Sequence, residues 1–410
     1  MLGQGRKAQT KLLLLLTVAA GIAPAYAGDA GTLTMRGSLG AEIRAFTMRP
    51  AYALQDSDPV QGSIIANAKL SWTSANNDVV IDVAPFLRLD DTDDERTHGD
   101  LREAAVTVYS DHLDLRLGIS KVYWGVTESR KLVDIVNQTD LVEEPEGDEK
   151  LGQPMVMLRG HVADFEAAAL VLPAFRPRTF PGSEGRLRPA LAIDEDRAQY
   201  ESGERTGRVD VAGRLKGRID DIDIGLSYFS GTSREPRIVF DGTTLAPVYD
   251  VIDQAGLDVQ ATLDRTLLKL EAITRDGHRG SDARRFSAVV AGVEHTISQI
   301  FETAWDLGLI LEFNWDDRPS SAPPTIYDKD FFVGARFAFN DDGDSSALLG
   351  ALIDAEKGSV YATIEASTRL YESLRIEIEG SFILHAGDRD SVLRQYRDDS
   401  FLSVRLIHFL

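Results

Sequence analysis

The chain has no cysteine among its 410 residues. Without thiols it cannot form disulfide bonds, bind zinc through cysteine, attach haem through a thioether or carry out thiol redox chemistry. This absence excludes disulfide scaffolds and thiol-dependent enzymes. Packing and hydrogen bonding must therefore stabilise the fold.

Basic residues are in the minority. The chain has 44 lysine and arginine residues against 65 aspartate and glutamate residues, and its net charge is −21. Proteins that bind nucleic acid neutralise phosphates with clustered basic side chains. A chain this acidic is therefore not expected to have a nucleic-acid partner.

Long apolar runs are absent beyond the N-terminus, so no membrane-spanning helix is predicted, because such a helix needs ~20 apolar residues. The one apolar stretch, LLLLLTVAAGIAPA (12–25), follows three basic residues and leads into AYA (25–27). This arrangement predicts a cleaved signal peptide over residues 1–27. The alternative, an uncleaved membrane anchor, requires a longer apolar stretch.

Residues 28–410 are expected to form a single domain. Cleavage would remove three basic residues and no acidic ones, which makes the net charge of residues 28–410 equal to −24.

What the sequence does contain is alternation. In AWDLGLILEFNWDDR (304–318) the odd positions from Trp305 to Trp315 are apolar, and the even positions are mostly polar or small. A period of two indicates a strand with two different faces. The run has about a dozen residues, which suits an oblique crossing of a bilayer by a strand, and the aromatic residues at its ends match interfacial girdles.

The same alternation recurs along the chain, in about 18 runs, with 16 as the alternative count. Short connections alternate with long ones, apart from the short segment EKG (356–358). Closure of the sheet would leave no unpaired edge in hydrocarbon. The fold class expected is all-β: a transmembrane antiparallel β-barrel with short periplasmic turns and long outer loops, located in the bacterial outer membrane.

The chain ends on an alternating segment, SFLSVRLIHFL, with Phe409 next to last. Outer-membrane barrels end on a comparable strand that the barrel assembly machinery recognises, usually with the aromatic residue last. The expected partners are this machinery, outer-membrane lipid and lipopolysaccharide, and a small polar solute.

The segment LRLGISKVYWGVTESRKLVDIVNQTD (115–140) resembles the strand and inner loop of alginate-export-like and related proteobacterial outer-membrane barrels. The positions that match are Gly118, Trp124, Gly125, Asp134 and Asn137. The resemblance implies a porin-like barrel of the transport class, and GLDVQATLDRTLLKLEAITRDG (256–277) resembles a hairpin of the same group. With Asp140, the four positions from Trp124 onward are the candidates for an inner-loop constriction.

Charged residues on the polar faces of the expected strands are predicted to line the pore. They either form opposed acidic and basic rows across a wet channel or pair between neighbouring strands in a closed lumen. A barrel of 16–18 strands leaves room for water, which favours the channel. The predicted residues are Arg36, Glu42, Arg44, Lys69, Arg88, Arg116, Lys269, Glu271, Asp306, Glu312, Arg336, Glu365, Arg369, Arg375 and Glu377.

Two long loops have unusual composition. Residues 126–151 combine an apolar segment (132–136), which suggests burial against the inner wall and narrowing of the pore, with the acidic run EEPEGDE (143–149). That run either binds a divalent cation or is a solvated acidic loop. Residues 175–206 carry Arg176, Arg178, Arg186 and Arg188, which form either a cationic patch or part of a mixed surface loop.

The function expected is a porin-like channel for passive, charge-influenced diffusion or export of small polar solutes, without cofactor, assigned metal site or catalytic activity. One alternative is a plugged structural or adhesion barrel. Another is an outer-membrane lipid-modifying enzyme that uses His295 or His408 with Ser298, although the chain has no G-x-S-x-G motif.

Overall fold

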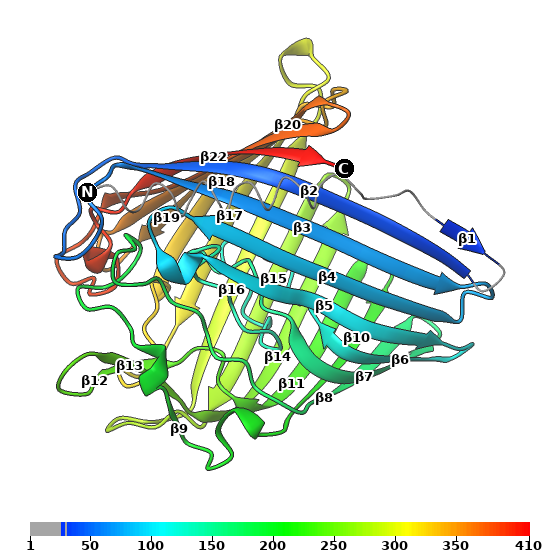
Figure 1. Ribbon diagram of the computed structural model, residues 1–410, viewed down its shortest axis with the longest axis horizontal. Coiled ribbons are helices and arrows are strands. Elements are labelled where there is room, and N and C mark those ends of the chain that lie inside the picture. Colours follow the sequence, from blue (N-terminus) through cyan, green and yellow to red (C-terminus); the bar gives the residue numbers. More distant parts are fainter. Residues whose placement is uncertain (1–25, 29–30) are drawn as a thin grey trace, which may run out of the picture.

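The computed structural model describes residues 26–28 and 31–410, so most of the predicted signal peptide lies outside the described residues. Between residues 31 and 410, eighteen antiparallel strands pair with their neighbours, and β2 pairs with β22 to close the barrel (Figure 1). The predicted all-β barrel is confirmed, with the larger of the two expected strand counts.

Most of the barrel strands have nine residues or more, which is enough for an oblique bilayer crossing. They are β2 (Gly31–Phe46), β3 (Val60–Ser74), β4 (Val79–Asp90), β5 (His98–Tyr109), β6 (Leu113–Ser120), β7 (Gln153–Val162), β8 (Phe165–Leu172), β10 (Asp210–Ile219), β11 (Ile222–Thr232), β14 (Val251–Leu263), β15 (Thr266–Asp276), β16 (Phe286–Ile297), β17 (Asp306–Asp316), β18 (Lys329–Ala338), β19 (Ser346–Asp354), β20 (Val360–Tyr371), β21 (Leu374–His385) and β22 (Phe401–Phe409).

Short turns join the strands at one end of the barrel, and the longer loops gather at the other, on the left in Figure 1. The segment 355–359, between β19 and β20, lies at the long-loop end although it is short. The exception noted in the sequence is therefore a short outer loop and not a miscounted hairpin.

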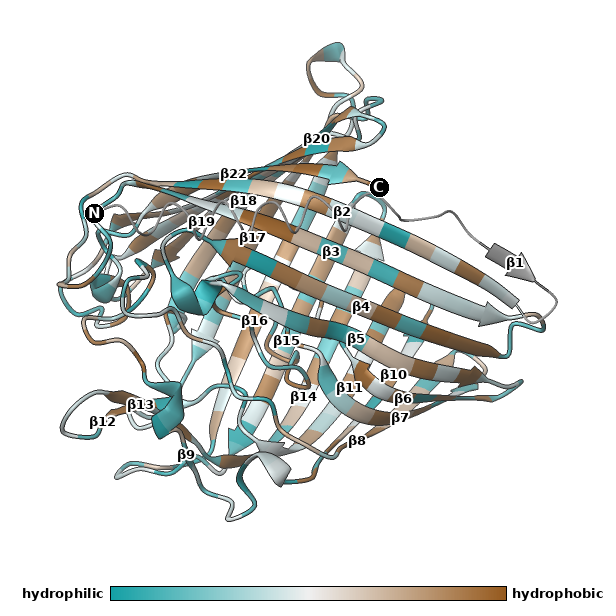
Figure 2. Ribbon diagram, in the orientation of Figure 1, coloured by the Kyte–Doolittle hydropathy of each residue, from teal (hydrophilic) through white to brown (hydrophobic). Residues whose placement is uncertain are grey.

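The two faces of the strands differ in the way that the alternation predicts. In β17, Leu309, Leu311 and Phe313 are exposed on the outside, whereas Ile310 and Glu312 are buried inside. Figure 2 shows the same alternation of apolar and polar residues along neighbouring strands. An apolar outer face is what a strand requires when lipid surrounds it.

Proline lies within one barrel strand without breaking the sheet. Pro85 is in β4 at the point where the register between β4 and β5 shifts by one residue. Because proline has no N–H to donate, strands tolerate it at such bulges.

Several smaller elements were not predicted. β9 (Gln199–Tyr200), β12 (Arg237–Phe240) and β13 (Leu245–Tyr249) form a small sheet among the long loops, and β1 (Tyr26–Gly28) pairs with the start of β2. Short 3₁₀ helices span Asp94–Arg96, Glu195–Arg197, Arg205–Gly207, Ile300–Glu302 and Leu393–Gln395. Within the described residues, no helix is both long enough and apolar enough to cross a membrane.

Candidate functional site

The segment between β6 and β7, residues 121–152, enters the barrel; we refer to it as the inner loop. Its apolar side chains, including Leu132, Val133 and Val136, are buried together with inward-facing residues of the wall such as Phe229 and Ile252. Because β7, β8, β10, β11 and β14–β16 all contribute to this cluster, the inner loop has its own apolar core inside the lumen. The apolar segment noted in the sequence accounts for this placement.

Two carboxylates of the wall bind the inner loop by its backbone. Glu271 of β15 accepts hydrogen bonds from the N–H groups of Val126 (2.6 Å) and Thr127 (3.0 Å), and from the Thr127 hydroxyl (2.7 Å). Glu312 of β17 accepts the N–H groups of Glu128 and Ser129, both at 2.8 Å. Hydrogen bonds to a charged acceptor are stronger than neutral ones, so these two residues act as anchors for the loop.

A glycine allows this close approach. Gly125 has φ +112°, and a Cβ at this position would lie 2.7 Å from Glu271 Oε1. Any larger residue would both strain the backbone and displace the carboxylate that holds the loop.

The inner loop also reaches the opposite side of the barrel. Arg88 of β4 binds the Glu143 carboxylate through two nitrogens (2.8 Å each), and Arg102 of β5 binds Asp140 (2.7 Å). Tyr361 of β20 donates its hydroxyl to Glu146 (2.8 Å). The loop therefore crosses the lumen from β15 and β17 to β4, β5 and β20.

Two cavities remain beside the inner loop. The larger, about 500 Å³, lies toward β18–β21 and is lined by Tyr327, Tyr361, Thr363 and Glu365, among others. The smaller, about 210 Å³, lies toward β2–β5 and β22 and is lined by charged side chains that include Arg88, Lys121 and Arg405. Both cavities have charged side chains in their walls.

A cluster of arginines surrounds one carboxylate beside the smaller cavity. Glu42 of β2 lies 2.6 Å from Arg96, 2.7 Å from Arg405, 3.1 Å from Arg88 and 3.9 Å from Arg44. Each guanidinium has a further partner or stacks on an aromatic ring; Arg44, for example, lies over Phe401. The cluster joins β2, β4 and β22, across the closure of the barrel.

All fifteen predicted pore-lining residues lie on the inward faces of their strands, but six of them are buried. Covering by the inner loop or pairing with neighbouring charges explains the burial, since interior charges need partners. The six residues are Glu42, Arg44, Arg88, Lys269, Glu271 and Glu312.

The other predicted lining residues are more accessible, and several pair with neighbours as the alternative interpretation expected. Lys69 lies 3.2 Å from Glu103, Arg336 lies 2.5 Å from Glu128, and Arg116 also pairs with Glu103. Three of the remaining residues, Asp306, Arg36 and Arg369, lie toward the short-turn end of the barrel. On β21, the Arg375 guanidinium lies 3.4 Å from the Glu377 carboxylate. Glu365 lines the larger cavity.

The inner-loop candidates have separate structural tasks. The Trp124 ring is part of the apolar core. Asn137 closes the base of the loop, because its amide bonds Val122 N–H, Ser120 O and Leu151 O, each at 2.9 Å. Asp140 accepts from Arg102 and from the Thr179 hydroxyl (2.7 Å each).

Asp134 is an inner-loop carboxylate with weak compensation. Its side chain is buried, and its closest cation is the Lys150 ammonium at 3.8 Å. Burial raises the pKa of Asp134 to about 6, because the charged form has lost its water.

The acidic run is partly paired with basic side chains and partly solvated, since Glu146 and Asp148 are exposed. Glu143 pairs with Arg88, Asp148 with Lys131 (2.9 Å) and Glu149 with Lys121 (2.7 Å). Basic side chains thus compensate the charge of these three carboxylates. Glu144 is not paired in this way, and burial together with the nearby Glu379 raises its pKa to about 8.

The arginines of the second long loop do not form a cationic surface patch. Arg186 is buried and binds Asp399 (2.9 Å), and Arg188 is buried and donates to backbone carbonyls of Ser183 and Ala53. Both hold the outer loops together at the mouth of the barrel. Arg176 and Arg178 are only partly covered and bind Asp100 and Gln138.

Some residues of the site were not predicted from the sequence. Arg405 lies on the polar face of an alternating segment, so the strand period contained the signal for it. Arg102 is the extra residue at the register shift opposite Pro85, where the alternation is broken. Arg96 lies in a 3₁₀ turn outside the strands and reaches Glu42 only because the chain folds back. No local pattern marks Arg96.

The comparisons with known proteins concern the fold. No protein-family profile matches the chain, and no curated protein matches it in sequence. Two solved structures from Pseudomonas aeruginosa are similar in fold. For OccD3 (OpdP) the TM-score is 0.53 at 11% identity, with 96% of each chain covered. For OccK3 (OpdO) the TM-score is 0.51 at 12% identity, with 92% of this chain and 95% of that chain covered.

A third similar structure is Wzi of Escherichia coli, described as a carbohydrate-binding β-barrel and outer-membrane protein involved in group 1 capsule assembly. Its TM-score is 0.51 at 9% identity, with 90% of this chain and 83% of that chain covered. The resemblance to alginate-export-like barrels remains a prediction. The described part of the chain has the fold, and the apolar outer face, of a bacterial outer-membrane β-barrel.

Proposed function

We propose that the protein is an outer-membrane channel for small polar solutes, in which the inner loop sets the width of the path. The observation that carries this proposal is the inner loop itself, which is anchored on Glu271 and Glu312 and leaves two cavities beside it, both with charged side chains in their walls. A barrel of this size leaves an aqueous interior unless protein fills it.

The lining favours charge-influenced passage. Acidic and basic side chains line the larger cavity in equal number, among them Glu365 and Lys131, whereas around the smaller cavity basic residues such as Arg88 and Arg405 outnumber the acidic ones. A solute that passes on one side of the loop therefore meets a field different from the field on the other side, and charged walls of low dielectric amplify such fields.

The test is single-channel recording of the purified full barrel in planar lipid bilayers. Stepwise conductance is expected, and replacing residues 128–149 by a short Gly/Ser linker should raise it. A folded parent protein without any conductance would reject the channel.

A plugged barrel that binds carbohydrate is the second candidate. Contacts of the inner loop with both sides of the lumen favour it, as do the tyrosines Tyr327, Tyr361 and Tyr396 around the larger cavity. The similar fold of Wzi, a carbohydrate-binding barrel, is consistent with this candidate. Saturable binding of oligosaccharides by a non-conducting barrel would replace the channel proposal with this one.

We expect no lipid-modifying activity. Within the described residues, neither His295 nor His408 forms a hydrogen bond with Ser298; His295 bonds the Thr266 hydroxyl through Nδ1 at 2.8 Å instead. An esterase assay with detergent-dispersed phospholipid checks this expectation, and turnover that survives His295→Ala would have to come from another residue.

A further inference from the structure

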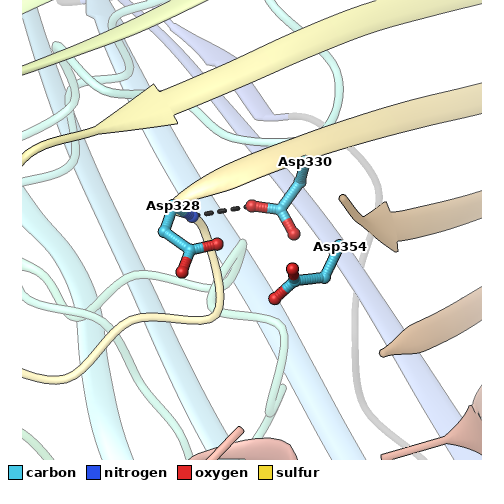
Figure 3. Close-up of side chains that lie close together, drawn as sticks. All are labelled: Asp328, Asp330 and Asp354. Atoms are coloured by element: carbon cyan, nitrogen blue, oxygen red, sulfur yellow. Dashed lines mark hydrogen bonds between the residues drawn. The ribbon is translucent and has the colours of Figure 1, made fainter. Parts of the chain in front are cut away.

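Three aspartates meet at the long-loop end of the barrel, where β18 begins and β19 ends. Asp330 and Asp354 are direct cross-strand partners, and Asp328 precedes β18. One carboxylate oxygen from each lies within 4.8 Å of the others, and Figure 3 shows the three carboxylates around a shared space. Like charges placed directly opposite each other destabilise a sheet, and a cation between the carboxylates would remove this repulsion.

Backbone hydrogen bonds orient two of these carboxylates and leave one oxygen of each without a hydrogen bond. Asp330 Oδ2 accepts the N–H of Asp328 (2.7 Å), and Asp354 Oδ1 accepts the N–H groups of Glu356 (2.8 Å) and Lys357 (2.6 Å). Asp330 Oδ1 and Asp354 Oδ2 are buried and accept no hydrogen bond. The two residues are only 1% and 4% exposed.

Lys357 supplies part of the compensating charge. Its ammonium lies 2.5 Å from Asp328 Oδ2 and 3.5 Å from Asp354 Oδ2. One lysine serves three carboxylates, so the ionised cluster carries an excess of negative charge, and uncompensated buried charge is costly.

We propose that Asp328, Asp330 and Asp354 bind one divalent cation, with Ca²⁺ preferred. Calcium takes carboxylate oxygens at about 2.3–2.6 Å, so two ligands of one ion are separated by up to about 5 Å, which suits this spacing. Calcium also accepts irregular geometry and completes its shell with water, whereas Mg²⁺ demands a nearly ideal octahedron.

The bound ion would tie the loop 317–328 to the β18–β19 hairpin. Tyr327, the neighbour of Asp328, donates its hydroxyl to Ser129 O of the inner loop (2.7 Å). The cation therefore stabilises the outer support of the inner loop as well as the rim of the barrel.

The experiment is calcium titration by isothermal calorimetry on the full barrel, refolded in detergent without lipopolysaccharide and stripped with a chelator. We expect one Ca²⁺ per chain, with Asp330→Asn and Asp354→Asn each weakening binding at least about tenfold. Asp388→Asn is the matched control, because its side chain is fully exposed in a neighbouring outer loop. It should leave binding unchanged.

Lys357→Met tests whether the space between the aspartates binds a metal ion or is occupied by the Lys357 ammonium. It keeps all three carboxylate ligands. Loss of the competing ammonium should strengthen Ca²⁺ binding in a protein that already binds it. Absence of binding in the parent chain, binding that appears only in Lys357→Met, or equal binding in all aspartate variants would overturn the proposal.

Discussion

Glu312 Oε2 accepts both the backbone N–H (2.8 Å) and the hydroxyl (2.6 Å) of Ser129, a residue 183 positions earlier in the chain. This pair joins the middle of the inner loop to the wall of β17. The strand places the carboxylate inside the barrel, and the loop brings donors that would otherwise lack partners in the apolar interior.

Glu312→Ala should therefore release the loop from β17. Hydrogen bonds to a charged group contribute roughly 1.5–3 kcal/mol each, so the inner loop should lose about 3 kcal/mol of its stability against the wall. Single-channel currents should become larger or noisier. Glu372→Ala, in an exposed short turn, is the control. Currents identical to the parent would mean that this anchor does not position the loop.

The outer face of β17 should reject charge. Leu309 is 47% exposed on the outside of the barrel, and Leu309→Arg should cost roughly 2–4 kcal/mol in lipid vesicles, because a guanidinium there must be dehydrated or must thin the bilayer. Reversible unfolding in vesicles measures this cost.

The control for Leu309→Arg is an arginine at an inward-facing position, and Ile310 is not suitable for it. Alternation alone predicts that arginine is tolerated there, but Ile310 is buried against Phe332, Leu348 and Leu352. Thr363, which lines the larger cavity on β20, is the suitable comparison, and Thr363→Arg should fold nearly as well as the parent. Equal losses for Leu309→Arg and Thr363→Arg would contradict the assignment of the two faces.

The arginine cluster depends on Glu42. Glu42→Gln removes the negative charge that compensates the buried guanidinium groups of Arg88 and Arg96. We therefore expect the free energy of unfolding to fall by about 3–5 kcal/mol. The same change at Glu377, which is partly exposed and lies 3.4 Å from Arg405, should cost less than about 1 kcal/mol. Similar unfolding free energies for Glu42→Gln and Glu377→Gln would mean that the cluster is not a stabilising centre.

Asp134 should make the inner loop sensitive to pH. Its pKa is raised from 3.8 to about 6, so the folded state holds a proton that the unfolded chain has already released. Stability therefore falls as the pH rises from about 4 to about 6 and stays lower above that range. Asp134→Asn should lack this slope and be more stable at pH 7 by about 3 kcal/mol.

The measurement is amide hydrogen exchange of residues 121–152 at pH 5 and pH 7, corrected for the intrinsic rate. Asp388→Asn, outside the inner loop, should keep the behaviour of the parent. A parent whose loop protection is the same at both pH values would argue against a buried, charged Asp134.

The absence of cysteine makes labelling a direct test of the lumen. Glu365→Cys should react with a small charged thiol reagent in water, because Glu365 lines the larger cavity. Ile364→Cys, the adjacent position on the lipid-facing side of β20, should be protected in vesicles. Protection at position 365 with labelling at 364 would reverse the faces of this strand.

The alternation of side chains determined the barrel and the direction of its side chains. Successive side chains of a strand point to opposite faces, and in this barrel one face meets lipid and the other meets charged groups. The inward and outward positions of a strand can therefore be assigned from its own sequence, as in β17 from Leu309 to Glu312. The same logic identified the inward positions of Glu42, Glu271 and Arg336. The apolar residues between Leu132 and Val136 also indicated that this loop segment is buried.

Tertiary structure decided which inward charges meet and which meet water. Glu42 and Arg96 lie 54 positions apart and Glu312 and Ser129 lie 183 apart, and only the path of the loops brings them together. Ile310 has the same inward orientation as Glu312 but packs against Phe332 and Leu348 of the neighbouring strands, which alternation cannot show. Asp328, Asp330 and Asp354 meet because β18 and β19 pair in one particular register, and register is a property of the closed sheet rather than of any single strand.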